Sequence, residues 1–154
     1  MADGRSAYAP HMDIAGSCHC GNIALALRWP GNPAEIPARA CDCTFCTRHG
    51  GIWTSAPDAE LDVTVRDPAL VTRYAFGTRT ADFHVCSRCG VVPLVTCSIG
   101  GRLFAVVNVN TLEDRVRTRA RTAPARFEGE AVDDRLARRQ RNWIGVVRGI
   151  AQPS

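Results

Sequence analysis

Short apolar runs, each closed by turn residues, follow one another along most of the chain. The run at residues 23–29, Ile-Ala-Leu-Ala-Leu-Arg-Trp, is followed by a Pro-Gly-Asn-Pro segment and predicts the first strand. Further runs of this kind predict strands at residues 52–56, 61–65, 70–76, 81–85, 91–96 and 103–109. Such short strands at close spacing predict a mainly β fold built from small antiparallel sheets.

Helical spacing is clear only near the C-terminus. Val132, Leu136, Gln140 and Trp143 recur at or near every fourth residue behind an acidic pair, which predicts one short helix there. Residues 43–49 could form a single helical turn. Residues 1–12 have no periodic pattern and predict a poorly ordered leader. Because 154 residues leave little room for a second domain, we expect one domain over residues 13–154.

The composition is that of an ordinary globular protein, with 45% hydrophobic and 22% charged residues, which argues against a mainly disordered chain. All 19 basic residues are arginine, but the net charge of +4 is too small to indicate a nucleic-acid partner by itself. No apolar run reaches the roughly 18 residues that span a bilayer, and the first residues lack the apolar stretch of a signal peptide. We therefore expect a cytoplasmic protein with no membrane partner.

The eight cysteines are grouped rather than scattered. Two close pairs, Cys18 with Cys20 and Cys86 with Cys89, are each followed by a glycine that permits a tight turn. Zinc prefers four ligands in a tetrahedron, and two short pairs from distant segments supply four thiolates without straining the backbone. In a reducing compartment such pairs bind metal more often than they form disulfides, so we predict a closed, structural zinc site. The alternative is two unrelated pairs of buried or disulfide-bonded cysteines.

A third group, Cys41, Cys43 and Cys46, offers only three ligands. Zinc held by three protein ligands keeps one position for water or substrate, which distinguishes catalytic from structural sites. The group therefore predicts an open zinc site. Alternatively, His49 or Asp42 completes a second structural site, or the group binds no metal.

The segments around these cysteines resemble a known family. Gly16-Ser17-Cys18-His19-Cys20-Gly21, the segment from Cys41 to Gly51 and Cys86-Ser87-Arg88-Cys89-Gly90 are similar, in this order, to the glutathione-dependent formaldehyde-activating (GFA) family. The similarity runs from about Gly16 to about Asp114. It implies a zinc-binding β-tent domain with two zinc ions, one held by four cysteines and one by three. The implied activity is the condensation of formaldehyde with glutathione to S-hydroxymethylglutathione, classed as a carbon-sulfur lyase reaction in the reverse sense.

Four residues near the cysteine triplet are candidates for the chemistry of a thiol substrate and a small aldehyde. His49 is the nearest group that could protonate the alkoxide formed when a thiolate adds to the aldehyde. Arg48 could bind a substrate carboxylate, and Phe45 and Trp53 could wall the site. The alternatives are a hydrogen bond that orients a cysteine or surface exposure for His49, surface exposure for Arg48, and core packing for the two aromatic residues.

Two features lie outside this interpretation. Cys97 has no partner at ligand spacing, so we expect a buried, unreactive thiol. Nine arginines lie between residues 115 and 141, and those at 115, 117, 119 and 121 would share one face if the segment were extended. Such a stripe would suit a noncatalytic binding module for nucleic acid or a protein, which is the alternative function, although no interleaved aromatic residues favour base stacking.

Overall fold

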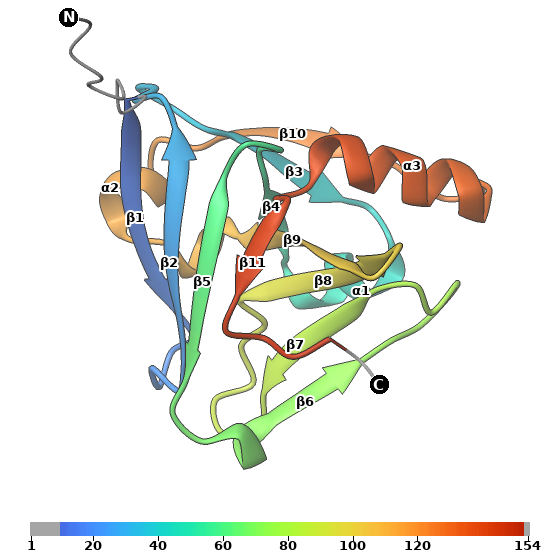
Figure 1. Cartoon of the computed structure of the whole chain (residues 1–154), viewed down its shortest axis with the longest axis horizontal. Coiled ribbons are helices and arrows are strands. Elements are labelled where there is room, and N and C mark those ends of the chain that lie inside the picture. Colours follow the sequence, from blue (N-terminus) through green and yellow to red (C-terminus); the bar gives the residue numbers. More distant parts are fainter. Residues whose placement is uncertain (1–9, 153–154) are drawn as a thin grey trace, which may run out of the picture.

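A computed structural model describes residues 10–152 of the chain. Within them the chain forms two sheets, shown in Figure 1. The smaller sheet has the strand order β1 (His11–Ser17), β2 (Ile23–Pro30), β5 (Glu60–Val65) and β11 (Val146–Arg148). The larger has the order β10 (Arg121–Ala125), β3 (Pro37–Cys41), β4 (Ile52–Thr54), β9 (Arg102–Asn108), β8 (Leu94–Ile99), β7 (Asp82–Cys86) and β6 (Val71–Tyr74).

Helices are short and connect or cover these sheets. The α-helices are α1 (Thr44–His49), α2 (Asp114–Arg117) and α3 (Val132–Asn142), and two 3-10 turns lie at Pro68–Leu70 and Val109–Thr111. The predicted C-terminal helix is therefore confirmed, and the turn considered at residues 43–49 is α1. No helix in the described residues is long and apolar enough to cross a membrane.

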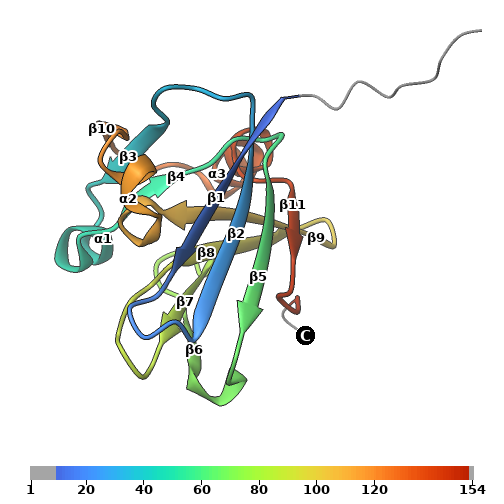
Figure 2. The ribbon, with the colours of Figure 1, turned by 90° about the vertical axis from the view of Figure 1, so that its left-hand side faces the viewer.

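Alternating apolar residues place β2 and β5 as expected. Along β2 the side chains of Ile23, Leu25, Leu27 and Trp29 are buried, while the residues between them are at least partly exposed. Figures 1 and 2 show that the strands of the smaller sheet run across those of the larger one. The apolar face of the smaller sheet packs on β8 and β9, and this forms the first core.

A second core lies on the other face of the larger sheet. It contains Trp53 of β4, Phe104 of β9 and Trp143, and partly buried Phe45 of α1 and Leu136 of α3 pack against it. Strand β9 is buried from Leu103 to Asn108 because it is covered on both faces. The larger sheet therefore separates two cores, and α1 and α3 lie at the second.

The mainly β fold is confirmed, and most strand pairs are antiparallel as predicted. Two pairs at sheet edges are parallel instead, β10 with β3 and β11 with β5. In both cases a long connection brings the chain back in the same direction, which local hydrophobic pattern does not reveal. The sequence pattern also missed β1, β3, β10 and β11, which are short or mostly exposed.

The predicted leader is too long at its C-terminal end. His11 and Met12 belong to β1, where they pair with Pro30 and Trp29 of β2. Only Ile14 of β1 is fully buried, so the strand depends on pairing with β2 rather than on its own alternation. Residues 1–9 of the predicted leader lie outside the described residues.

Candidate metal centre and active site

The first candidate site joins two turns that are far apart in the sequence. Cys18 and Cys20 lie between β1 and β2, Cys86 ends β7, and Cys89 lies in the turn that follows. The four sulfurs lie within 4.8 Å of one another, with 3.8 Å between Cys18 and Cys20 and 3.5 Å between Cys20 and Cys86. The fold therefore brings together the two pairs that the sequence singled out.

Both turns have the backbone that the glycines predicted. Gly21 and Gly90 have φ angles of 82° and 79°, in the left-handed region that favours glycine. In each turn the glycine amide donates to a cysteine carbonyl, Gly21 to Cys18 and Gly90 to Cys86. These turns allow closely spaced sulfurs to converge.

Cys18 and Cys89 differ in the pKa of their thiols because their surroundings differ. Burial raises the pKa of Cys18 from 9.0 to about 11, against the opposing hydrogen bond from the amide of Ile23. Burial also acts to raise the pKa of Cys89, but hydrogen bonds from the amides of Cys20 and Val91 outweigh it and lower that pKa to about 6. The cluster thus has one thiol, Cys89, that ionises readily, and another, Cys18, whose ionisation a bound cation would favour.

The second candidate site is local. Cys41 ends β3, Cys43 caps the N-terminus of α1, and Cys46 is buried within that helix. The Cys43 sulfur accepts a hydrogen bond from the amide of Cys46 at 3.3 Å, and all three sulfurs lie within 4.8 Å of one another. A hydrogen bond between the Cys41 and Cys46 thiols lowers the pKa of Cys41 to about 6 and raises that of Cys46. The pKa of Cys41 is therefore lower than that of Cys46.

Both donor sets suit a zinc ion. In a tetrahedral thiolate site with zinc–sulfur distances of about 2.3 Å, neighbouring sulfurs lie about 3.8 Å apart, close to the spacing of the four-cysteine cluster. All eight cysteines are free thiols, so none is lost to a disulfide. The two clusters are therefore compatible with metal binding.

Neither residue considered as a fourth ligand joins the triplet. Among the described residues, the group of possible ligands at this place contains only its three cysteines. The Asp42 carboxylate instead pairs with Arg126 at 3.5 Å, and the His49 ring stacks on Phe45 with 5.4 Å between centroids. In the part of the chain that the structure describes, the protein thus offers three ligand atoms at this place.

The four candidate residues near the triplet differ in their exposure to solvent. Phe45 is partly exposed, whereas Arg48 and His49 are exposed on α1, where Arg48 donates to the Thr44 carbonyl. Trp53 is 5% exposed, and its indole N–H donates to the Cys46 sulfur at 3.3 Å. Trp53 thus lies behind Cys46, on the protein side of the cluster.

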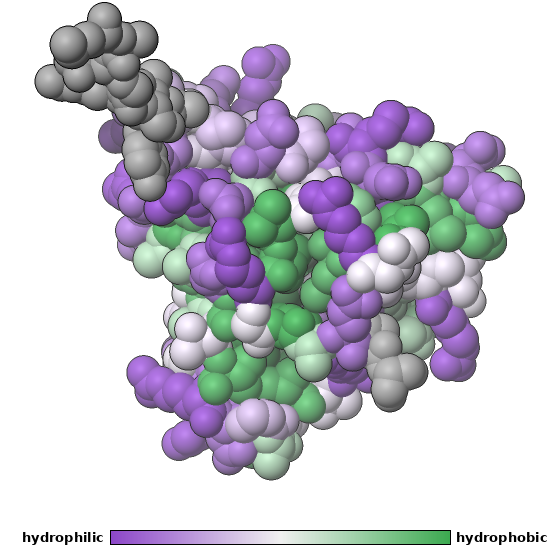
Figure 3. Space-filling model, in the orientation of Figure 1, coloured by the Kyte–Doolittle hydropathy of each residue, from purple (hydrophilic) through white to green (hydrophobic). Residues whose placement is uncertain are grey.

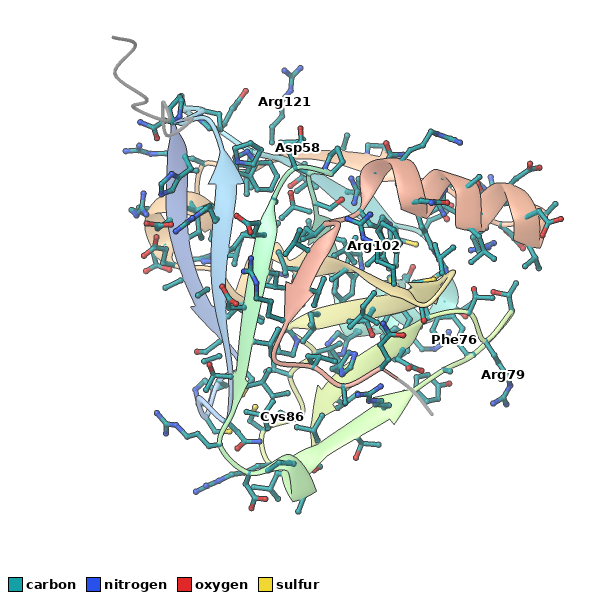
Figure 4. All side chains as sticks on the ribbon, in the orientation of Figure 1. Asp58, Phe76, Arg79, Cys86, Arg102 and Arg121 are labelled. Carbon is teal, nitrogen blue, oxygen red and sulfur yellow. The ribbon has the colours of Figure 1, made fainter. Side chains whose placement is uncertain are left out.

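An aromatic cluster that sequence reasoning missed surrounds Phe45. Its ring lies 5.4 Å from Tyr74, 5.3 Å from Phe76 and 4.7 Å from Phe83, measured between centroids. These residues come from the predicted strands at 70–76 and 81–85, but no local signal relates them to a triplet about 30 residues away. In Figure 4, Phe76, which packs on Phe45 of α1, lies well apart from Cys86 of the four-cysteine cluster. The two cysteine clusters therefore occupy separate parts of the molecule.

The expected burial of Cys97 is confirmed, since it is 2% exposed. Its sulfur accepts a hydrogen bond from Arg139 at 3.5 Å, and it belongs to neither cluster. His84, on β7, is also buried and bonds to the hydroxyl of Thr96 at 2.7 Å. Neither residue is accessible to a substrate.

The predicted arginine stripe does not form, because its first residues are helical. Arg115 and Arg117 lie in α2, and they pair with Glu113 and Asp114 respectively. Farther along the chain, Arg135 and Arg138 both pair with Glu130. Figure 3 shows hydrophilic side chains over much of one face of the molecule. Most of the nine arginines between residues 115 and 141 thus form ion pairs, and they are not aligned along one extended segment.

Comparisons with known proteins show the family of this chain. The sequence model of the family described as glutathione-dependent formaldehyde-activating enzyme matches residues 13–128, which include both cysteine clusters. Among solved structures, the crystal structure of a Rhodobacter sphaeroides protein is 33% identical, covering 65% of this chain and 88% of that chain, with a TM-score of 0.45. Among curated proteins, none matches this chain.

Proposed function

Because the chain belongs to the glutathione-dependent formaldehyde-activating enzyme family, we propose that it adds a thiol such as glutathione to a small aldehyde such as formaldehyde. The product is a hemithioacetal of the S-hydroxymethylglutathione type. The enzyme acts as a carbon-sulfur lyase in the reverse direction. With eight free thiols, we place this activity in the reducing cytoplasm.

One observation carries the proposal: three converging thiols, with no fourth protein ligand among the described residues at that place. We assign Cys41, Cys43 and Cys46 to the catalytic zinc, and Cys18, Cys20, Cys86 and Cys89 to a structural zinc. Zinc at the triplet supplies a Lewis acid that lowers the pKa of a thiol, so that thiolate is present at neutral pH.

The bond changes are simple. The substrate thiol gives up its proton, its sulfur forms a bond to the aldehyde carbon, and the carbonyl electron pair moves to oxygen. The resulting alkoxide takes up one proton, so no oxidant or reductant is needed. The protein must therefore hold two small molecules together and supply a proton.

We assign the proton transfer to His49, which lies exposed on α1 three residues after Cys46. Its stacking on Phe45 fixes the plane of the imidazole, and the partly exposed Phe45 forms an apolar wall. Arg48 is exposed beside them, and its guanidinium can exchange the Thr44 carbonyl for a substrate carboxylate. The buried Trp53 lies behind Cys46 and closes the site on the side of the protein core.

Zinc content and a thiol titration test the proposal. We expect two zinc ions per chain in the wild type and one in Cys43→Ser, which should keep its far-ultraviolet circular dichroism but lose adduct formation from glutathione and formaldehyde. Cys97→Ser is the matched control, because Cys97 is buried but belongs to neither cluster, and it should retain two ions.

The visible spectrum of the cobalt-substituted protein tests whether a thiol binds at the triplet. Millimolar glutathione should change the cobalt spectrum of the wild type and leave that of Cys43→Ser unchanged. An unchanged wild-type spectrum would refute thiol binding at the triplet. A Cys43→Ser variant that retains turnover would refute the catalytic role of the site.

A further inference from the structure

Trp53 makes a hydrogen bond that a residue acting only as an apolar wall of the site would not need. Its indole Nε1–H donates to the Cys46 sulfur at 3.3 Å, and both residues are buried. The indole nitrogen is only a donor, and a thiolate is a stronger acceptor than a thiol. Among hydrogen bonds in the described residues, this one alone brings a side-chain N–H to a sulfur of either cluster.

The indole ring is held in place from several directions. The backbone of Trp53 is paired with Arg39 of β3 on one side and with Asn108 of β9 on the other. The ring packs edge to face on Phe83, with 5.9 Å between centroids. This support makes the N–H a fixed donor.

Gly51 lies close against the indole ring of Trp53. A Cβ atom at Gly51 would lie only 2.7 Å from Cζ2 and 2.9 Å from Cε2 of Trp53, so any larger residue must displace the indole. The amide of Gly51 also donates to the carbonyl of Cys46 at 3.2 Å. The absence of a side chain at residue 51 thus allows helix α1 and the indole to approach each other.

The three sulfurs of the triplet are therefore not equivalent. Cys43 accepts from the backbone amide of Cys46, a bond that any residue except proline at position 46 could supply. Cys46 accepts from a side chain, so its hydrogen bond depends on the identity of residue 53. A hydrogen bond to a thiolate withdraws electron density from sulfur and fixes its direction, and it thereby tunes a ligand from outside the coordination sphere.

We propose that Trp53 is a positioning residue, whose indole N–H orients Cys46 and tunes it as a metal ligand of the three-cysteine site. The inference rests on the proposed function, because it requires metal at that site. It assigns Trp53 to ligand tuning, with Gly51 as the residue that makes the contact sterically possible.

The test uses the full chain with cobalt in place of zinc. The difference spectrum between the wild type and Cys43→Ser isolates the charge-transfer band of the triplet. In Trp53→Phe, which keeps an aromatic ring but lacks the N–H, this band should move to longer wavelength because the sulfur is richer in electrons. Zinc affinity of the triplet, measured by competition with a chromophoric chelator, should fall about 10- to 100-fold.

Two further variants separate tuning from packing. Trp143→Phe is the matched control, because Trp143 is also buried in the second core and stacks with Arg139, without a hydrogen bond to a cluster sulfur. It should leave the band and the affinity unchanged. Gly51→Ala keeps the indole but displaces it, and it should shift the band in the same direction as Trp53→Phe.

The outcomes distinguish the two proposals. If the wild type has no triplet band, both the proposed function and this inference are wrong. If the wild type binds two metal ions but Trp53→Phe and Gly51→Ala leave the band and the affinity at wild-type values, only the role of Trp53 is refuted. A shift of equal size in Trp143→Phe would also refute it, because packing alone would then explain the effect.

Discussion

His84 is predicted to make the protein less stable in mild acid. Its side chain is buried on β7, and Nε2 bonds to the Thr96 hydroxyl at 2.7 Å, whereas Nδ1 has no hydrogen-bond partner. Burial, with a smaller contribution from Arg73 on the paired strand β6, lowers the pKa of His84 from 6.5 to about 4. The folded protein therefore keeps this imidazole neutral where the unfolded chain protonates it.

The size and sign of the effect follow from the two pKa values. Above pH 6.5 the imidazole is neutral in both states and contributes no pH dependence. Below it the unfolded chain binds the extra proton, so the free energy of unfolding falls as the pH falls toward 4. The loss amounts to about 2 kcal/mol at pH 5 and approaches about 3 kcal/mol near pH 4 and below.

Urea unfolding of the wild type and of His84→Gln, followed by circular dichroism between pH 7.5 and 5, measures this loss. Cysteine thiolates also protonate in acid and lose any affinity for metal, but both proteins have the same cysteines, so the difference between them isolates His84. The wild type should lose about 2 kcal/mol more than the variant on going to pH 5. A difference that stays constant over this range would show that folded His84 accepts a proton, and would refute the reasoning.

Three further substitutions test the packing and the ion pairs. Ile144→Ala, at a side chain with 0% exposure in the first core, should lower the free energy of unfolding by about 2–5 kcal/mol in urea; a loss near zero would mean that the site collapses. Glu130→Gln should cost about 1 kcal/mol at pH 7, because hydrogen bonds from Arg138 lower the pKa of this carboxyl below 4.5. That stability is present above pH 4.5 and is lost as the pH falls through the lowered pKa of the folded carboxyl, so the gap between the two proteins should shrink in acid, and a gap of constant size would contradict the assignment. Gly149→Ala should cost more than about 2 kcal/mol in the same assay, because φ is +85° and the new Cβ would overlap the carbonyl oxygen of Val63; a neutral result would rule out this contact.

Sequence reasoning located the candidate ligands because metal sites depend on short spacings. The pairs at residues 18 and 20 and at 86 and 89, with a glycine after each, define turns that bring two sulfurs together whatever the rest of the fold does. The triplet is equally local, since Cys43 and Cys46 lie on one helical turn. Alternation along β2 and β5 likewise located strands whose one face is buried.

The same reasoning could not reveal the hydrogen bond that Trp53 makes. From the sequence it is an aromatic residue near a strand, suited to a wall or a core. Its role as a hydrogen-bond donor to Cys46 follows from the pairing of β4 with β3 and β9, which sets the direction of the indole. Tyr74, Phe76 and Phe83 were missed for a similar reason, because the return of β6 and β7 to α1 places them there.

The sequence by itself determined which residues could bind metal and which segments could be strands, because both properties are set by neighbours a few residues apart. The tertiary structure alone decided that Cys20 and Cys86, 66 residues apart, meet at 3.5 Å, and that β10 and β11 add as parallel edges. It also decided that Arg115, Arg117 and Arg138 form ion pairs. Such pairings depend on burial summed over the whole chain, and no local period encodes that sum.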